Sequence, residues 1–213
     1  PTTLRVPKVH GVVATGRGPA LVVSILPGIP LDSKWSHLKP WQIIGNIAAT
    51  IHDWDPSCFT DLLDGHRDCQ AHALIALKNF DGLDGVEAAG ARTWCLDHLP
   101  TIKPTSVLHG DLLGQNVLID FGQPPGLLDW EYAKIGDPAY DLAVVTRGAK
   151  RPFGAQNGTE LLVRSYNQAR GSNVRATDVH FYELCLAAGW VQDAIANNDG
   201  PGRVAAAQGR MRS

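Results

Sequence analysis

The sequence predicts an α+β fold in which helices outnumber strands. Two segments, one near the start and one near the middle of the chain, carry paired apolar runs on either side of a glycine and proline turn. Several longer segments place apolar residues at helical spacing. Hairpins set apart from a run of helices are the pattern of an α+β protein.

The first of these segments predicts a β-hairpin that ends in a stiff turn. The β-branched runs 9–14 and 20–26 are separated by Thr15-Gly16-Arg17-Gly18-Pro19. The glycine pair invites comparison with a phosphate-binding loop, but the third glycine and the helix start that such loops need are missing, so we favour a plain turn. Pro27 to Leu31 then ends the sheet.

Helical periodicity begins at Pro40, since proline is favoured in a first turn and isoleucines follow at helical spacing. Further helices are predicted at 71–80, 85–99, 139–147, 158–169 and 177–196. The run Asn197 to Gly202 predicts a break before a short last helix. His52 and His98 lie near predicted helix ends, where a histidine more often caps carbonyl groups than catalyses, so capping is the favoured interpretation and neither is assigned a role.

Composition places the chain among ordinary globular proteins. It has 213 residues, 44% hydrophobic composition and a net charge of -2. The basic residues are scattered, which argues against a nucleic-acid partner. No apolar run is long enough to cross a bilayer and no signal-peptide layout opens the chain, so we expect no membrane association and a cytoplasmic location. Oligomeric state has no signal in the sequence.

The cysteines suggest neither a disulfide framework nor a zinc knuckle. The four cysteines are far apart and form no CxxC pair. His66, Cys69 and His72 share helical spacing and could hold a metal from one face. With no fourth ligand nearby, a solvated or half-buried helix face is the favoured interpretation.

The most specific feature of the chain is the run HGDLLGQNVLID at residues 109–120, followed by Asp129 in GLLDW. The apolar runs 117–119 and 126–128 flank a glycine and proline turn, which predicts a second hairpin. Antiparallel pairing would bring Asn116 and Asp129 to the same end, beside the loop that carries Asp111. We therefore predict that Asp111 is a catalytic base and that Asn116 and Asp129 are Mg²⁺ ligands.

The order of these residues matches the protein-kinase template. Protein kinases carry H-R-D-x-x-x-x-N, in which the aspartate accepts a hydroxyl proton and the asparagine binds Mg²⁺, and a D-F-G aspartate follows. Four residues separate Asp111 from Asn116, as in that template, and Asp129-Trp130-Glu131 stands where D-F-G would stand. Gly110 in place of the arginine favours a small-molecule kinase.

At these residues the chain resembles the aminoglycoside phosphotransferase and choline kinase family, a group of protein-kinase-like small-molecule kinases. HGDLLGQN, LLDWE and GDPAYDL occur in the family's order within residues 109–142. The resemblance implies a protein-kinase-like fold, made mainly of the helical C-terminal lobe. It also implies ATP and Mg²⁺ as cofactors and transfer of the γ-phosphate to a hydroxyl of a small molecule.

The resemblance further assigns roles to individual residues. The peptide groups of Ser24 and Leu26 would contact the adenine edge from a hinge, with Leu118 as the floor under the purine; an ordinary edge strand is the alternative. His109 and Asp141 would support the catalytic loop, the first through a carbonyl group and the second through backbone N–H groups.

One part of the family pattern has no counterpart in this sequence. Kinases of this type need a strand-borne lysine and a helix-borne glutamate in the N-terminal lobe. Lys8 is in no position to match, and no glutamate precedes Glu87. We therefore expect a truncated chain, with residues 1–30 a remnant of the N-terminal lobe and hinge and residues 31–213 the helical C-terminal catalytic lobe.

Two other functions are open on the sequence alone. A truncated, catalytically inactive kinase-like remnant could act as a binding module. A metallophosphatase interpretation of HGDLLGQN is less favoured. Such enzymes need several histidine metal ligands after the asparagine, and only His180 follows His109.

The acceptor is not identified by any motif. Aminoglycoside-like, choline-like and sugar or amino-alcohol compounds all fit a hydroxyl acceptor. Glu183, Asp193 and Asp199 could line an acidic pocket for a cationic compound, although solvated helix faces are the favoured interpretation.

Overall fold

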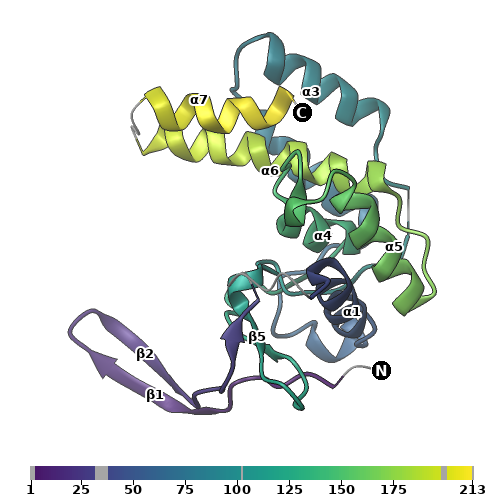
Figure 1. Cartoon of the computed structure of the whole chain (residues 1–213). Coiled ribbons are helices and arrows are strands. Elements are labelled where there is room, and N and C mark those ends of the chain that lie inside the picture. The colour runs from purple at the N-terminus through teal and green to yellow at the C-terminus, as the bar shows by residue number, and fades with distance from the viewer. Residues whose placement is uncertain (1–2, 32–37, 102, 198–200, 213) are drawn as a thin grey trace.

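The computed structural model describes residues 3–31, 38–101, 103–197 and 201–212. It shows a helical body from which one β-hairpin projects (Figure 1). The helices are α1 (Pro40–His52), α2 (Cys69–Ala76), α3 (Val86–Asp97), α4 (Pro138–Thr146), α5 (Gly158–Arg170), α6 (Ala176–Ala196) and α7 (Pro201–Gly209). The strands are β1 (Val9–Thr15), β2 (Gly18–Val23), β3 (Ile29–Pro30), β4 (Ser106–Leu108), β5 (Val117–Ile119), β6 (Gly126–Leu127) and β7 (Lys134–Gly136).

The predicted helices are all present, with ends displaced by a few residues. Some begin at a clear start signal: Pro40 opens α1, and the Asp137 side chain accepts a hydrogen bond from Ala139 at the start of α4. Helix α6 ends at Ala196, just before the predicted break, and residues 198–200 of that break lie outside the described residues. Gly202, which was assigned to the break, lies within α7.

The body is held together by helix packing. Helix α1 lies along α5, and α4 packs against α6, which also contacts α7. The contact faces are aliphatic and aromatic: Ile47, Leu142, Tyr166 and Phe181 are fully buried. Burial of this kind removes apolar area from water and stabilises the body by about 25 cal/mol per Å². The core therefore lies between α1, α4, α5 and α6.

Two small sheets flank this core. Strands β3, β5 and β6 form one antiparallel sheet, with Val117 opposite Leu127 and Leu118 opposite Gly126. Strands β4 and β7 form the other. The second predicted hairpin is thus confirmed as β5–β6, while β3, β4 and β7 are two or three residues long and were not anticipated as strands.

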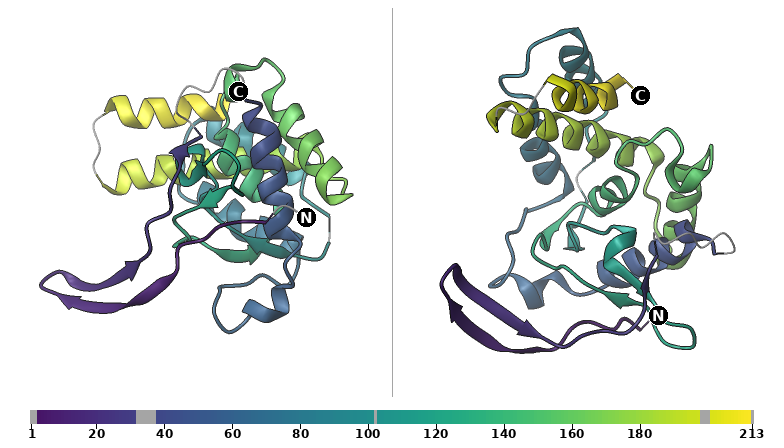
Figure 2. Two further views of the ribbon diagram at one scale, coloured as in Figure 1. Left: turned by 60° about the horizontal axis from the view of Figure 1, so that its bottom comes forward. Right: turned by 60° about the vertical axis from the view of Figure 1, so that its left-hand side comes forward.

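The first predicted hairpin is also present, but it packs against little. Strands β1 and β2 pair from Thr15–Gly18 to Val9–Val23, so β2 ends three residues before the predicted Leu26. The hairpin extends away from the body in each view (Figure 2). Most of its residues are exposed on both faces. Backbone pairing between its two strands is therefore the main source of its order.

Candidate active site

The loop from β4 to β5 contains the predicted catalytic residue Asp111, is called the catalytic loop below, and brings Asp111 into contact with Asn116. The Asn116 amide nitrogen donates to both the backbone oxygen and the Oδ2 atom of Asp111, each at 2.9 Å. Because both partners are acceptors, the NH₂ end of the amide must face Asp111. The Oδ1 atom of Asn116 is then turned away from Asp111, and an amide oxygen is a ligand type that Mg²⁺ accepts.

The β5–β6 hairpin places Asp129 beside this pair. The Leu128 N–H donates to the Asn116 backbone oxygen at 2.9 Å, one residue before Asp129. Asp129 is exposed and has a φ of 66°, an uncommon conformation for a residue with a side chain. The hairpin register therefore brings the backbone of Asp129 next to Asn116, at the end of the hairpin where Asn116 contacts Asp111.

The electrostatics of this end are acidic. The pKa of Tyr132 is raised above its ordinary value, first by the charge of Glu131 and also by those of Asp111 and Asp129. Negative charge from these side chains thus acts on one phenol. A cation bound here would relieve the repulsion, which fits a divalent metal bound with nucleotide phosphates.

A tight backbone crossing explains the glycine of the HGD motif. Gly110 has a φ of 81°, and a Cβ atom at this position would overlap the backbone carbonyl of Tyr132. Any side chain, including the arginine of the protein-kinase motif, would therefore displace one of the two segments. The segment after Asp129 and the segment before Asp111 are locked against each other.

Asp141 lies under the catalytic loop and is fully buried. It accepts hydrogen bonds from the backbone N–H groups of His109 and Gly110, both at 2.8 Å, and lies 3.1 Å from Nε2 of His52. Burial acts to raise the pKa of Asp141, but the His52 contact and the backbone donors hold it below the ordinary value. A carboxylate thus anchors the loop.

His109 joins the catalytic loop to the hairpin end. Its Nε2 lies 2.9 Å from the carbonyl oxygen of Leu128, and its Nδ1 lies 3.3 Å from the Asp111 N–H. This pairing places the ring proton on Nε2, because a carbonyl can only accept. The imidazole also packs against Trp130, with ring centroids 4.6 Å apart. His109 is therefore positioned to hold the backbone next to Asp129.

A chain of buried polar side chains behind Asp141 was not predicted from the sequence. His52 does not cap carbonyl groups as expected: it is buried, with Nδ1 3.0 Å from the Tyr166 hydroxyl and Nε2 on Asp141. Arg170 donates to the same hydroxyl at 2.7 Å. Burial lowers the pKa of His52 against the opposing effect of Asp141, and burial raises the pKa of Tyr166 to about 12. His98, in contrast, does contact the Trp94 carbonyl as predicted.

The predicted nucleotide contacts lie at the base of the projecting hairpin. The Ser24 N–H donates to the Lys8 carbonyl at 2.9 Å, so this N–H is already engaged within the chain. A Cβ atom on Gly126 would lie 3.2 Å from Leu118 Cβ and 3.3 Å from Leu26 Cδ1. The side chains of Leu26 and Leu118 therefore meet over Gly126.

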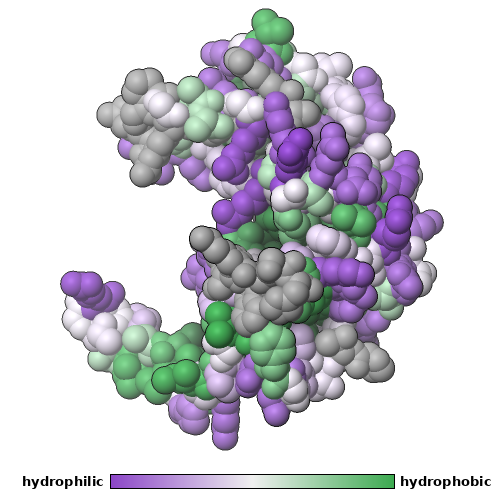
Figure 3. Space-filling model, viewed as in Figure 1, coloured by the Kyte–Doolittle hydropathy of each residue, from purple (hydrophilic) through white to green (hydrophobic). Residues whose placement is uncertain are grey.

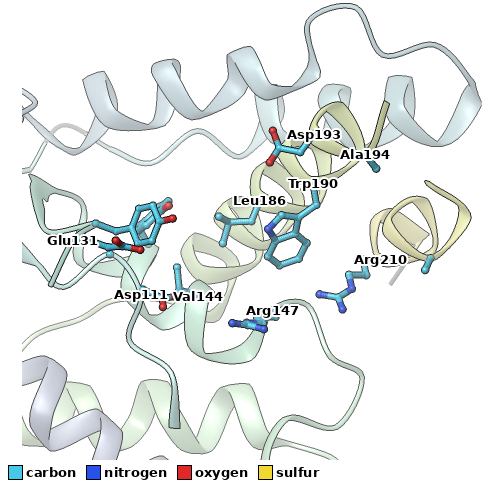
Figure 4. Close-up of a pocket in the computed structure, with 13 residues that line it drawn as sticks. Asp111, Glu131, Val144, Arg147, Leu186, Trp190, Asp193, Ala194 and Arg210 are labelled. Atoms are coloured by element: carbon cyan, nitrogen blue, oxygen red, sulfur yellow. The ribbon is translucent and has the colours of Figure 1, made fainter. Parts of the chain in front are cut away.

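A cleft of about 850 Å³ opens in front of Asp111 (Figure 4). Its walls come from the catalytic loop, the segment after Asp129, α4, α6 and the C-terminal helical segment. The lining residues are Gly110, Asp111, Glu131, Tyr132, Tyr140, Val144, Arg147, Leu186, Trp190, Asp193, Ala194, Ala206 and Arg210. A cleft of this size is typical of a small-molecule site.

The three acidic residues suggested for an acceptor pocket do not lie together in the cleft. Asp193 lines the cleft. Glu183 does not: it is buried, accepts from the Thr146 hydroxyl and contacts His180 at 3.1 Å. Asp199 lies outside the described residues. Glu183 is on the inner face of α6, where the sequence pattern could not distinguish a buried acid with partners from an exposed one.

The side chains of His66, Cys69 and His72 are engaged in local contacts, and they do not share one helix face because His66 precedes α2. His72 Nδ1 accepts from the Asp137 N–H at 2.9 Å, and Cys69 donates to the Pro104 carbonyl at 3.3 Å. The rings of His66 and His72 stack with centroids 4.5 Å apart. Within the described residues no cluster of three or more His, Cys, Asp or Glu side chains has metal-binding geometry.

The helical lobe, the anchored HGD loop and the hairpin that follows it define a protein-kinase-like fold. The phosphotransferase enzyme family, APH, matches residues 1–179 through its family model. The chain therefore belongs to this family.

Two similar proteins illustrate the match. Viomycin phosphotransferase of Streptomyces vinaceus is 43% identical over 84 residues, which cover 38% of this chain and 26% of that protein. Homoserine kinase of Neisseria meningitidis serogroup B is 44% identical over 48 residues, which cover 22% and 16%. The matched segments thus span less than two thirds of these curated relatives.

A solved structure supports the fold over almost the whole chain. A thermostable mutant of aminoglycoside phosphotransferase APH(4)-Ia, in a ternary complex with ADP and hygromycin B, superposes with a TM-score of 0.69 at 17% identity. The match covers 98% of this chain and 76% of that one.

None of the helices in the described part of the chain is long and apolar enough to cross a membrane.

Proposed function

We propose that this chain provides the metal and acceptor sites of an ATP- and Mg²⁺-dependent phosphotransferase that acts on a hydroxyl of a small molecule. The observation that carries the proposal is the double hydrogen bond from the Asn116 amide to Asp111, at the hairpin end that also carries Asp129. Family membership and the nucleotide complex of a similar fold support it.

Asp111 would act as the base. It borders the cleft, where an acceptor hydroxyl can approach it, and it is held by Asn116. The acceptor oxygen forms a bond to the γ-phosphorus, the bond from that phosphorus to the β,γ-bridging oxygen breaks, and the hydroxyl proton passes to Asp111. Positioning of the reactants supplies most of the reduction in the activation barrier, because phosphoryl transfer has a loose transition state.

Asn116 and Asp129 would hold the metal. Asn116 offers Oδ1 and Asp129 an exposed carboxylate, both hard oxygen ligands suited to Mg²⁺. Bound MgATP would supply the phosphoryl group and the remaining oxygen ligands. His109 and Asp141 fix the loop from behind, through the Leu128 carbonyl and through two backbone N–H groups.

Residues 1–30 would act as the N-terminal lobe segment and hinge, and residues 31–213 as the catalytic lobe. The adenine edge would meet the Ser24 carbonyl and the Leu26 N–H, with Leu118 beneath the ring. This is supported by the packing of Leu26 and Leu118 over Gly126. The comparisons do not favour the alternative of an inactive binding module.

The test is calorimetric titration with ATP, with Mg²⁺ and with EDTA, followed by an assay of phosphate transfer to viomycin and hygromycin B. We expect Mg²⁺ to strengthen nucleotide binding and Asp129→Asn to remove that gain. Asp111→Asn should keep nucleotide affinity but lower transfer by about a hundredfold or more, the usual contribution of a general base. Asp84→Asn, at an exposed position, is the control.

Two outcomes contradict the proposal. One is the absence of binding heat with MgATP. The other is nucleotide affinity that depends on Mg²⁺ equally in the wild type and in Asp129→Asn.

A further inference from the structure

The cleft in front of Asp111 carries both signs of charge, in separate places. Asp111 and Glu131 lie toward one side, while Arg147 and Arg210 lie toward the other, with Trp190 above the two arginines (Figure 4). A pocket built only for a polycation would be lined by carboxylates without guanidinium groups. The two arginines therefore need an explanation.

Arg147 has no protein partner for its charge within the described residues. It follows the last turn of α4, and its backbone N–H donates to the Ala143 carbonyl at 2.8 Å. No hydrogen bond or ion pair reaches its guanidinium group from the described part of the chain, although Glu131 and Asp193 line the same cleft. The group is exposed at the cleft wall and available to a ligand.

The backbone at Arg147 makes this residue a costly choice for the position. Its φ is 51°, in the left-handed region, which disfavours residues with a Cβ atom by about 1 kcal/mol or more. Helix α5 ends in the same conformation with Gly171, the residue that such helix ends usually carry. A favourable interaction of the Arg147 charge with the C-terminal end of α4 could offset part of that cost. Thermal unfolding of Arg147→Gly tests this structural explanation.

Arg210 approaches the same wall from the far end of the chain. Its guanidinium carbon lies 4.8 Å from the centre of the Trp190 ring. Its backbone carbonyl lies beside Gly148, the residue after Arg147, since a Cβ atom there would be 4.0 Å from it. Two guanidinium groups from distant parts of the sequence thus border one side of the cleft.

We propose that the acceptor bound in this cleft carries a carboxylate, held by Arg147, in addition to the hydroxyl presented to Asp111. This inference rests on the proposed function. A guanidinium group and a carboxylate match in charge and in planar geometry and form strong paired hydrogen bonds. The carboxylates of Glu131 and Asp193 also suit an ammonium group, so hydroxylated zwitterions such as hydroxy amino acids are the class that fits both signs of charge.

The test uses matched probes that differ only by a carboxylate. L-serine is paired with ethanolamine and L-homoserine with 3-aminopropan-1-ol, so that two distances between hydroxyl and carboxylate are sampled. Binding is measured by calorimetry or by saturation-transfer difference NMR on the wild type, Arg147→Gly and Arg147→Lys. Arg17→Gly, in the exposed turn of the β1–β2 hairpin, is the control.

We expect the carboxylate-bearing member of at least one pair to bind about tenfold more tightly than its partner, as a charge-assisted contact implies. Arg147→Gly should remove the difference, Arg147→Lys should keep part of it, and Arg17→Gly should leave it unchanged. Because glycine suits the left-handed backbone, Arg147→Gly should remain folded, which thermal unfolding checks.

Several results would overturn the inference. The members of each pair could bind equally or not at all, or Arg147→Gly could weaken both members alike. Arg147→Gly could instead lower MgATP affinity alone, which would assign the arginine to the nucleotide. If Arg147→Gly lost thermal stability but still bound the carboxylate-bearing probe more tightly than its partner, Arg147 would have a structural role at the end of α4. Since MgATP binding is measured separately, failure of the proposed function is distinguishable from failure of this inference.

Discussion

The catalytic loop and the β1–β2 hairpin are built on opposite principles. Polar groups around Asp141 are buried and fully paired, and in the described residues no buried side-chain nitrogen or oxygen lacks a hydrogen-bond partner. The hairpin instead exposes apolar side chains, with Val12 at 64% and Leu21 at 66% exposure, and Ile25 just after it at 94%. Figure 3 shows this as a hydrophobic surface at the lower left of the molecule.

This difference shows where order comes from in each region. The hairpin is ordered mainly by the backbone ladder between two neighbouring strands, so its side chains contribute little. The catalytic loop is ordered by contacts between distant parts of the chain, such as His52 with Tyr166. Substitutions should therefore have large effects near Asp141 and small effects on the hairpin.

The largest effect is expected from Asp141→Ala. It leaves the N–H groups of His109 and Gly110 and the imidazole of His52 without their acceptor, and breaking a buried charged contact costs about 3–5 kcal/mol. The free energy of unfolding from urea titration should fall by that amount. Asp61→Ala, at an exposed position, should change it little. Equal effects of the two substitutions would mean that Asp141 does not anchor the loop.

Acidification should weaken the buried region next. Burial lowers the pKa of His52, and burial followed by the charge of His66 lowers that of His72 to about 3. Below pH 6.5 these two histidines therefore bind protons in the unfolded chain but not in the folded chain, so the free energy of unfolding falls. Burial raises the pKa of Asp137 to about 6, so protonation of the folded state there partly offsets the loss. We expect a net loss of about 2 kcal/mol between pH 7 and 5.

Urea midpoints at the two pH values measure this loss. His10→Gln, on the exposed hairpin, should leave the pH dependence unchanged because no buried group is altered. A constant midpoint across the range would show that the buried histidines are not linked to folding.

A smaller effect is expected from Tyr166→Phe. The substitution keeps the ring volume but removes the hydroxyl between His52 and Arg170. Loss of such a hydrogen bond costs about 1 kcal/mol. Tyr132→Phe, whose ring is exposed, is the matched control, and the two unfolding free energies are compared directly. Identical values would remove Tyr166 from the anchoring chain.

The smallest effect is expected from the paired hairpin substitutions Val12→Thr and Leu21→Thr. Threonine suits a strand, and the replaced side chains are exposed, so the free energy of unfolding should change by about 0.5 kcal/mol or less. A fall of more than about 1 kcal/mol would indicate that the hairpin is covered by another surface in solution, and the comparison of the two regions would fail.

Local patterns were enough to predict the part of the site that lies close together in the sequence. The β5–β6 pairing follows from two apolar runs around a proline turn, and it brings Asn116 next to the residue before Asp129. Helix positions followed from periodicity and from start signals such as Pro40. The approximate ends differ because flanking residues and tertiary contacts decide the last turn.

The rest depends on tertiary contacts that no local pattern encodes. Strands β4 and β7 are three residues long and pair across a separation that includes the whole catalytic loop. His52 looked like a helix cap because its neighbours on α5 are more than a hundred residues away. Arg147 and Arg210 line the same cleft from the end of α4 and from the C-terminal segment, so no local sequence pattern predicts that they lie together.

The chain that supports Asp141 also sets an order of events during synthesis. Protein emerges from the ribosome from its N-terminus, and early segments can begin to fold before later ones exist. A nascent chain that has emerged as far as α4 contains Asp111, Asn116 and Asp129 but not Tyr166 or Arg170, which fix His52. The full set of contacts around Asp141 therefore forms only when α5 has emerged and docked, so the order of translation sets the time at which the HGD loop is anchored.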